Sequence, residues 1–367
     1  MPEPIFIEPH KAAMAVVDQD HLPNLTTVGS TASSMNYDED FVFLCSKTDS
    51  NKFGDAVVPI FFYVVFTISL LGNGLILFLL LKFENIKTVT NLFIFNLVVS
   101  DLLFTVSLPF WAYYHSYEWI FGDSLCKVVS SMFYVGFYSS ILFLTMMTID
   151  RYMAVVHAIY AARTRKLLYV YLASAVIWVT SLLSTIPKFI LYGTRDDVQS
   201  GTLCVETGYQ VDTIRWWKMV GYCQQLLMFF LIPLAIILYC YTLIVVKLYR
   251  TKMHNKDKAV KLILIIVLAF FVCWTPFNAV LFIGLQNLYQ ESQDGNCSNT
   301  IDYVFYVCRN IAYFHCCVNP FFYTFVGTKF RGHLASLFGN WLRCGMRYRH
   351  PSLSSKTSEY SPQTIYE

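Results

Sequence analysis

The sequence predicts an all-α membrane protein, folded as a seven-transmembrane helix bundle. Two observations lead to this fold class. Of the 367 residues, 56% are hydrophobic and only 14% are charged, whereas about 25% of the residues in an ordinary soluble domain are charged. A transmembrane helix needs about 20 mainly apolar residues, and seven separate stretches of the chain meet that requirement. They are residues 57–82, 91–114, 126–156, 167–187, 217–246, 260–285 and 301–327.

The domain organisation follows from these stretches. Residues 1–56 form an acidic N-terminal tail, 57–327 form the helix bundle, and 328–367 form a short amphipathic helix and a C-terminal tail. Lysine and arginine collect after the first, third and fifth stretches, and this bias marks the cytoplasmic side. An odd number of spans then leaves the N-terminus outside the cell. We therefore expect a multi-pass protein of the plasma membrane with an extracellular N-terminal tail.

The N-terminal tail carries two signals of an outside location. Asn24 begins an Asn-x-Thr triplet, which is an acceptor for N-glycosylation. Further along, a tyrosine is followed directly by three acids: Tyr37, Asp38, Glu39 and Asp40. Tyrosine sulfation occurs in such a setting, and the alternative is a plain solvated acidic run. In either case the negative charge would attract a basic soluble partner by long-range steering.

The second stretch contains a carboxylate, Asp101, in the middle of its apolar run. An ionisable residue inside a membrane is costly, and by default it is functional. Ser140 in the third stretch and Asn319 in the seventh could reach the same layer. One interpretation is a small hydrated pocket that holds a sodium ion in one state of the protein. The other is a polar core that only fixes helix packing. Apart from this sodium ion we expect no cofactor.

The third stretch ends on the triplet Asp150, Arg151 and Tyr152. An arginine at the end of a membrane helix must reach headgroups, water or a neighbouring acid, and Asp150 is that acid. When helices move, such a pair can open and expose the arginine inside the cell, which predicts a switch. Further switch residues lie beside proline kinks in later stretches. They are Tyr241, Trp274, Pro276, Asn319, Pro320 and Tyr323.

On this topology, four of the eleven cysteines lie outside the cell. They are Cys45, Cys126, Cys204 and Cys297. An even set in an oxidising compartment predicts two disulfides. Four cysteines allow three pairings, and the spacing does not choose among them; free thiols are the alternative. The remaining cysteines form no metal-binding pattern, so we expect no metal site.

The spans lack the motifs of other membrane-protein classes. They contain no HExxH, no GxSxG and no paired carboxylates, which argues against an enzyme. The seventh stretch has no lysine midway, which argues against a retinal-binding pigment. We also expect no nucleic-acid partner.

As a set, these positions resemble the rhodopsin-like (class A) G-protein-coupled receptors. More narrowly, the runs SLPFWA from Ser107 to Ala112 and HCCVNP from His315 to Pro320 resemble those of chemokine receptors. Within that family, the run CRNIAYFHCC from Cys308 to Cys317 is most similar to the C-type chemokine (lymphotactin) receptor. The resemblance implies that the outer cysteines pair as Cys126 with Cys204 and Cys45 with Cys297.

The resemblance also implies a mechanism. The acidic tail would capture the body of a basic chemokine, whose flexible end enters a cavity at the outer end of the bundle. The lining residues would be Trp111, Tyr114, Phe133, Tyr134, Trp274, Gln286, Arg309 and Tyr313. A heterotrimeric G protein would then dock on the inner side, with leukocyte chemotaxis and calcium signalling as the outcome. Receptor kinases, arrestin and membrane lipids are further expected partners. The alternative is an atypical scavenging receptor that internalises chemokine through arrestin without G-protein signalling.

One position departs from the family pattern. Many chemokine receptors carry a glutamate ten residues ahead of the Asn319 position, and this chain has Arg309 there. A buried cation in place of a buried anion inverts the local electrostatics, so a ligand end rich in positive charge is disfavoured at that point. Alternatively, Arg309 pairs with an acid of the outer loops such as Glu206.

Overall fold

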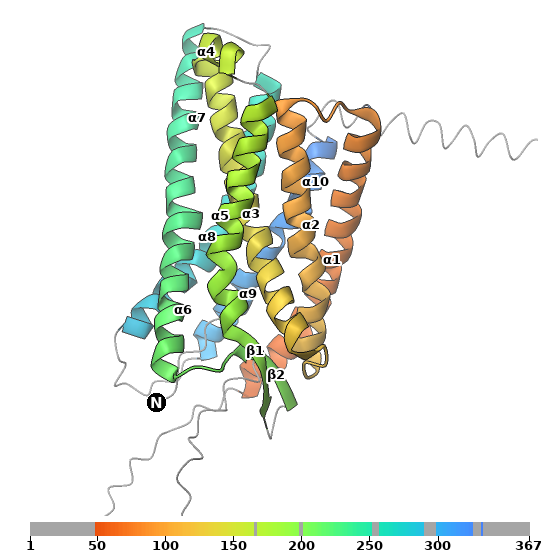
Figure 1. The fold of residues 1–367 in the computed structure, drawn as a ribbon, viewed down its shortest axis with the longest axis vertical. Coiled ribbons are helices and arrows are strands. Elements are labelled where there is room, and N and C mark those ends of the chain that lie inside the picture. Colours follow the sequence, from red (N-terminus) through yellow and green to blue (C-terminus); the bar gives the residue numbers. More distant parts are fainter. Residues whose placement is uncertain are drawn as a thin grey trace, which may run out of the picture.

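Long, roughly parallel helices make up the molecule (Figure 1). The computed structural model describes residues 48–164, 167–197, 201–251, 257–289 and 299–325, together with Gly332, and the statements below concern that part of the chain. The helices are α1 (Thr48–Phe83), α2 (Val89–Ser116), α3 (Gly122–Val156), α4 (Ala158–Thr164), α5 (Leu167–Leu191), α6 (Val211–Leu226), α7 (Ile232–Thr251), α8 (Asp257–Tyr289), α9 (Asn299–Tyr313) and α10 (His315–Phe325). The predicted amphipathic helix of residues 328–367 and the N-terminal tail lie outside the described residues.

Six helical segments are long and apolar enough to cross a membrane. They are Val57–Phe83, Val89–Ser116, Gly122–Val156, Leu167–Leu191, Asp212–Arg250 and Val260–Gln286. They correspond in order to the first six predicted stretches. A single apolar helix of this length can cross the hydrocarbon core because it satisfies all of its backbone hydrogen bonds internally.

The seventh predicted stretch is divided between α9 and α10, which have 15 and 11 residues. The interruption is at Phe314. Its N–H is shared between the carbonyls of Asn310 and Ile311 at 3.2 and 3.3 Å, and its own carbonyl accepts from the N–H of Cys317 at 3.0 Å. These shorter-range bonds tighten the turn and end the regular helix. Since α9 and α10 both pack against α1, the two helices together occupy the place of the seventh span.

The fifth predicted stretch, 217–246, is longer in the structure. Helix α6 begins at Val211, passes through a π-helical turn at Leu227–Leu231 and continues as α7 to Thr251. Pro233 lies directly after this turn. Proline cannot donate an intrahelical hydrogen bond, and π turns often occur where a helix accommodates such a break. Pro109, Pro187, Pro276 and Pro320 lie inside α2, α5, α8 and α10.

A two-stranded hairpin covers one end of the bundle, seen at the bottom of Figure 1. Strands β1 (Tyr192–Asp197) and β2 (Gly201–Glu206) are antiparallel, with Thr194 opposite Cys204. The hairpin follows the end of α5 and precedes the start of α6. On the predicted topology this end is the extracellular one.

Small residues allow two helix pairs to approach closely. A Cβ added at Gly136 of α3 would lie 2.6 Å from the backbone nitrogen of Phe104 in α2. A Cβ added at Gly72 of α1 would lie 2.9 Å from the ring of Pro320 in α10. Side chains at either position would push the helices apart, so these glycines bring α2 to α3 and α1 to α10.

Candidate functional site

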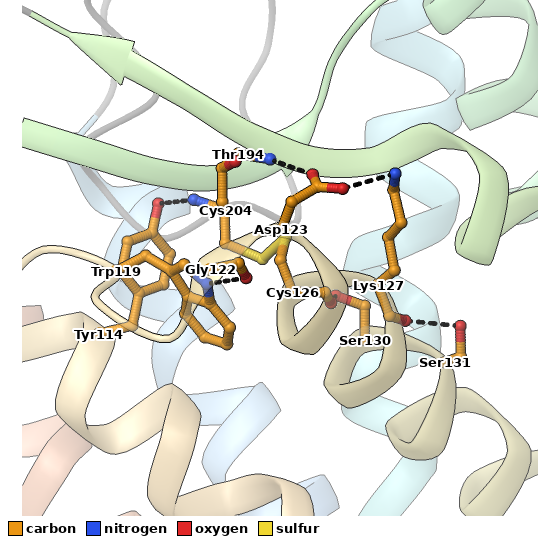
Figure 2. The surroundings of a disulfide bond; sticks show 10 residues. All are labelled: Tyr114, Trp119, Gly122, Asp123, Cys126, Lys127, Ser130, Ser131, Thr194 and Cys204. Carbon is orange, nitrogen blue, oxygen red and sulfur yellow. Dashed lines mark hydrogen bonds and ion pairs between the residues drawn. A yellow bond between two sulfur atoms is a disulfide. The ribbon is translucent and has the colours of Figure 1, made fainter.

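The outer hairpin is fixed to the helices at several points (Figure 2). Cys204 of β2 forms a disulfide with Cys126 of α3, with the two Cα atoms 5.6 Å apart. The N–H of Cys204 donates to the Tyr114 hydroxyl at 3.1 Å, and the N–H of Thr194 donates to Asp123 at 2.9 Å. The disulfide is the one that the resemblance implied; the other expected pair, Cys45 with Cys297, lies outside the described residues.

Three of the predicted ligand-binding aromatic residues form one cluster at the outer end of the bundle. The ring of Phe133 lies 5.1 Å from that of Tyr134 and 5.1 Å from that of Tyr313, centre to centre. Phe104 lies against both Phe133 and Tyr313, at 4.9 and 5.2 Å. The cluster therefore joins α2, α3 and α9 at the outer end of the bundle.

Other predicted ligand-binding residues lie in different surroundings. Trp111 is half-buried, and its ring is 5.9 Å from that of Trp119. Tyr114 is fully buried and supports the hairpin through Cys204. Gln286 is exposed near the end of α8. Contact with a ligand stays a prediction for all of them. For Tyr114 we expect any influence on ligand binding to be indirect, through its support of the hairpin.

Trp274 lies deeper than the cluster and is 1% exposed. Its ring stacks on Phe137 of α3 at 3.8 Å and lies 5.3 Å from the His315 ring. His315 in turn contacts Phe104 at 5.1 Å. A continuous set of rings thus connects the outer cluster to Trp274, two residues before Pro276 in α8.

Arg309 of α9 is buried, with 6% of its surface exposed. Its Nη2 donates to Nε2 of His115 at 3.2 Å. The guanidinium carbon lies over the rings of Phe62, Phe305 and Tyr306, at 5.6, 5.6 and 5.2 Å from their centres. Arg309 therefore contacts α1 and α2 as well as its own helix.

The alternative that Arg309 pairs with Glu206 is wrong in this structure. Glu206 of β2 instead forms an ion pair with Lys188 of α5, at 2.5 Å, and both residues are buried. The Lys188 ammonium also lies 5.3 Å from the centre of the Tyr134 ring. Lys188 was not predicted as a functional residue, because the fourth stretch was ended at Pro187. The position of Lys188 directly after an apolar stretch could have indicated a functional charge.

The predicted polar layer is assembled in the middle of the bundle. Asp101 is fully buried; its Oδ1 accepts from the Ser140 hydroxyl at 2.8 Å and its Oδ2 from Nδ2 of Asn319 at 2.7 Å. Asn73 donates to the carbonyl of Cys316 at 2.9 Å. The layer therefore links α1, α2, α3 and α10.

The oxygens of this layer fit an alkali cation in part. A carboxylate and a hydroxyl oxygen are neighbours, and hard cations prefer oxygen ligands. Asn319 presents its amide nitrogen to Asp101, so it would supply an oxygen only if the amide turned over. Both interpretations from the sequence, the sodium site and the polar packing core, stay predictions.

At the opposite end of α3, Nη2 of Arg151 lies 3.5 Å from Oδ2 of Asp150. Arg151 also donates to the hydroxyl of Thr90 in α2, a partner that the sequence did not indicate. The Tyr152 hydroxyl is hydrogen-bonded to His157 at 3.0 Å, and Tyr241 is buried on α7. Tyr323 belongs to α10, but its side chain lies outside the described residues. Arg151 is thus held by two neighbouring helices.

Comparison with known proteins identifies the class. The family described as "7 transmembrane receptor (rhodopsin family)" matches residues 72–323. The chain is 38% identical to C-C chemokine receptor type 4 of Homo sapiens over 80% of this chain and 81% of the relative. It is 36% identical to C-C chemokine receptor type 3 of Macaca mulatta over 94% and 96%, and 36% identical to C-C chemokine receptor type 8 of Homo sapiens over 84% and 86%.

The chain therefore belongs to the chemokine receptors of the rhodopsin family. Members of this family are signalling receptors, not enzymes, and they are multi-pass proteins of the plasma membrane with an N-terminus that is typically extracellular. The fold class predicted from the sequence is confirmed by the family match. The three relatives described above are named as C-C chemokine receptors, so the narrower resemblance to the C-type member stays a prediction.

Proposed function

We propose that this chain binds a basic extracellular chemokine and then activates heterotrimeric G proteins, with leukocyte chemotaxis and calcium signalling as the outcome. One observation carries the proposal: Arg151 at the inner end is bound to Asp150 and to Thr90 of a second helix. The Thr90 contact opens when α2 and α3 separate there, and the contact with Asp150, which lies on the same helix, opens when the Arg151 side chain turns away. A ligand that prefers the open arrangement would shift the population toward it.

We infer two regions of ligand contact. The acidic tail that includes Tyr37, Asp38, Glu39 and Asp40 would capture the body of the chemokine. The flexible end of the chemokine would then reach the cluster of Phe133, Tyr134 and Tyr313, with Trp111 and Arg309 beside it. The rings of Phe104 and His315 support the second contact region because they connect the cluster to Trp274.

Several narrower features belong to the same proposal. The run from Cys308 to Cys317 supports selectivity for C-type chemokines, whereas the relatives described above are receptors named for C-C chemokines. The hydroxyl-rich tail after residue 351 supports phosphorylation by receptor kinases and capture of arrestin through the added charge. Sodium at Asp101 would stabilise the closed arrangement. Membrane lipids surround the bundle.

The proposal is tested with a panel of purified C-C and C-type chemokines on cells that express the chain. We expect at least one chemokine to release intracellular calcium, and the response to be lost in Arg151→Ala at equal surface expression. A Cys240→Ala variant serves as the control for a buried change, because Cys240 is buried on α7 and is not among the predicted switch residues. Arrestin recruitment and internalisation without any G-protein response would support the scavenging alternative instead. No binding by any chemokine would contradict the proposal.

A further inference from the structure

Arg309 has no acidic partner among the residues that the structure describes. Among these residues its polar contact is the bond from Nη2 to His115, and its buried Nε has no hydrogen-bond partner there. A guanidinium carries five N–H donors and no acceptor. Burying this charge without a counter-ion is strongly unfavourable. Within the described part of the chain, the surroundings of Arg309 are therefore incomplete without an acceptor.

The neighbouring rings do not supply that acceptor. Phe62 from α1 and Phe305 and Tyr306 from α9 lie within 5.6 Å of the guanidinium carbon. Cation–π contacts of this kind offset part of the charge and hold the group in place. The rings accept no N–H hydrogen bond of the kind an oxygen pair would accept, and Nε has no hydrogen-bond partner among the described residues.

His115 adds no negative charge. Because arginine only donates, Nε2 of His115 is the acceptor, and the ring carries its proton on Nδ1 and is neutral. The imidazole therefore positions Arg309 without balancing it.

The contrast with Lys188 shows the excess of charge. Lys188 and Arg309 are the buried cations at the outer end within the described ranges, and Glu206 balances only Lys188. Among the described residues one buried positive charge is therefore left over. It lies near the predicted ligand-binding residue Tyr313, because Phe62 contacts Arg309 and its ring is 5.3 Å from that of Tyr313.

We propose that Arg309, positioned by His115, binds a carboxylate at the flexible end of the ligand. This inference rests on the proposed function and gives the ligand end a chemical class: acidic at the point that meets α9. A carboxylate can accept two parallel N–H bonds from one guanidinium, and here these would come from Nε and an Nη. Because Nε is buried, the carboxylate would reach it only after neighbouring side chains move.

A charge exchange tests the pairing. The probe is a chemokine that releases calcium through the wild-type chain, with each acid of its flexible end changed in turn to lysine. We expect Arg309→Glu to lower the potency of the unmodified chemokine about tenfold to a hundredfold. One lysine variant of the chemokine should regain at least tenfold on Arg309→Glu while losing potency on the wild type. If none does so, at equal surface expression, the inference is overturned.

A second measurement does not depend on chemokine binding. Purified receptor is melted in sodium acetate and in sodium chloride at matched ionic strength. We expect acetate to raise the unfolding midpoint of the wild type in a saturable way, and to raise that of the double variant K188M/E206L equally, since it keeps Arg309. Arg309→Gln should show no difference between the salts. Equal acetate effects in wild type and Arg309→Gln would overturn the anion site, whatever the outcome of the chemokine panel.

Discussion

Lys188 and Arg309 are both buried near the outer end of the bundle, but their surroundings differ in kind. Lys188 lies 2.5 Å from a carboxylate of the hairpin, whereas Arg309 has a neutral imidazole and three aromatic rings. The first arrangement is complete within the chain and joins β2 to α5. The second is stabilised but is not neutralised by any residue that the structure describes. The difference separates a structural ion pair from a site that can accept an anion from outside.

The largest expected effect is that of Glu206→Gln, which leaves the Lys188 ammonium buried without its anion. Breaking a buried pair by removing one partner costs about 3–5 kcal/mol. We expect a clear fall in the unfolding midpoint of purified receptor. The control is K188M/E206L, in which both charges are replaced by apolar groups, and it should unfold close to the wild type. If the single and double variants are equally destabilised, the pair is not what holds β2 to α5.

His115→Leu should have the next largest effect, because it removes the acceptor of a hydrogen bond from a charged donor. Such bonds contribute about 1.5–3 kcal/mol. His115→Gln retains a side-chain acceptor and is the matched control. The two variants are compared by thermal unfolding. Indistinguishable curves would mean that the hydrogen bond accepted by His115 does not stabilise the fold.

Phe62→Leu removes one of the three rings near Arg309 and keeps an apolar side chain. A cation–π contact contributes about 0.5–2 kcal/mol, so we expect a smaller shift of the unfolding midpoint. The matched control is Phe62→Tyr, which retains the ring. Stability unchanged in Phe62→Leu would show that the other two rings suffice.

Arg309→Gln should have the smallest effect on stability. Removing a buried charge that has no acid also removes its desolvation cost, so we expect a change within about 1 kcal/mol. The response to chemokine should nevertheless fall, as described above. A loss of stability as large as that of Glu206→Gln would erase the contrast between the two cations.

The sequence predicted the fold well because membrane helices are specified by length and hydropathy. The six long spans agree with the apolar stretches. The break at Phe314 could not be predicted, since it depends on which carbonyl the local N–H groups select and not on composition. The π-helical turn before Pro233 is similarly a choice among neighbouring hydrogen bonds.

The site was predictable in part. Asp101, Ser140 and Asn319 were expected in one layer, and Ser140 and Asn319 each donate a hydrogen bond to Asp101. The partners Thr90 and His115 were not expected, because each contact joins helices whose relative rotation the sequence does not state. Lys188 was not expected because the fourth stretch was ended at Pro187. Glu206 was offered as a partner of Arg309, but it pairs with Lys188, because the sequence does not state how the hairpin lies against the helices. The residues most easily predicted were charges alone in apolar surroundings.

The π-helical turn at Leu227–Leu231 has a consequence for probe design. A π turn contains one residue more than an α turn, so side chains after it are rotated by about 100° relative to an unbroken α-helix. A single helical wheel drawn from Val211 to Thr251 would therefore assign lipid-facing positions of α7 to the interior. Spin labels or crosslinking cysteines on this segment should be chosen from two wheels, one on each side of residue 231.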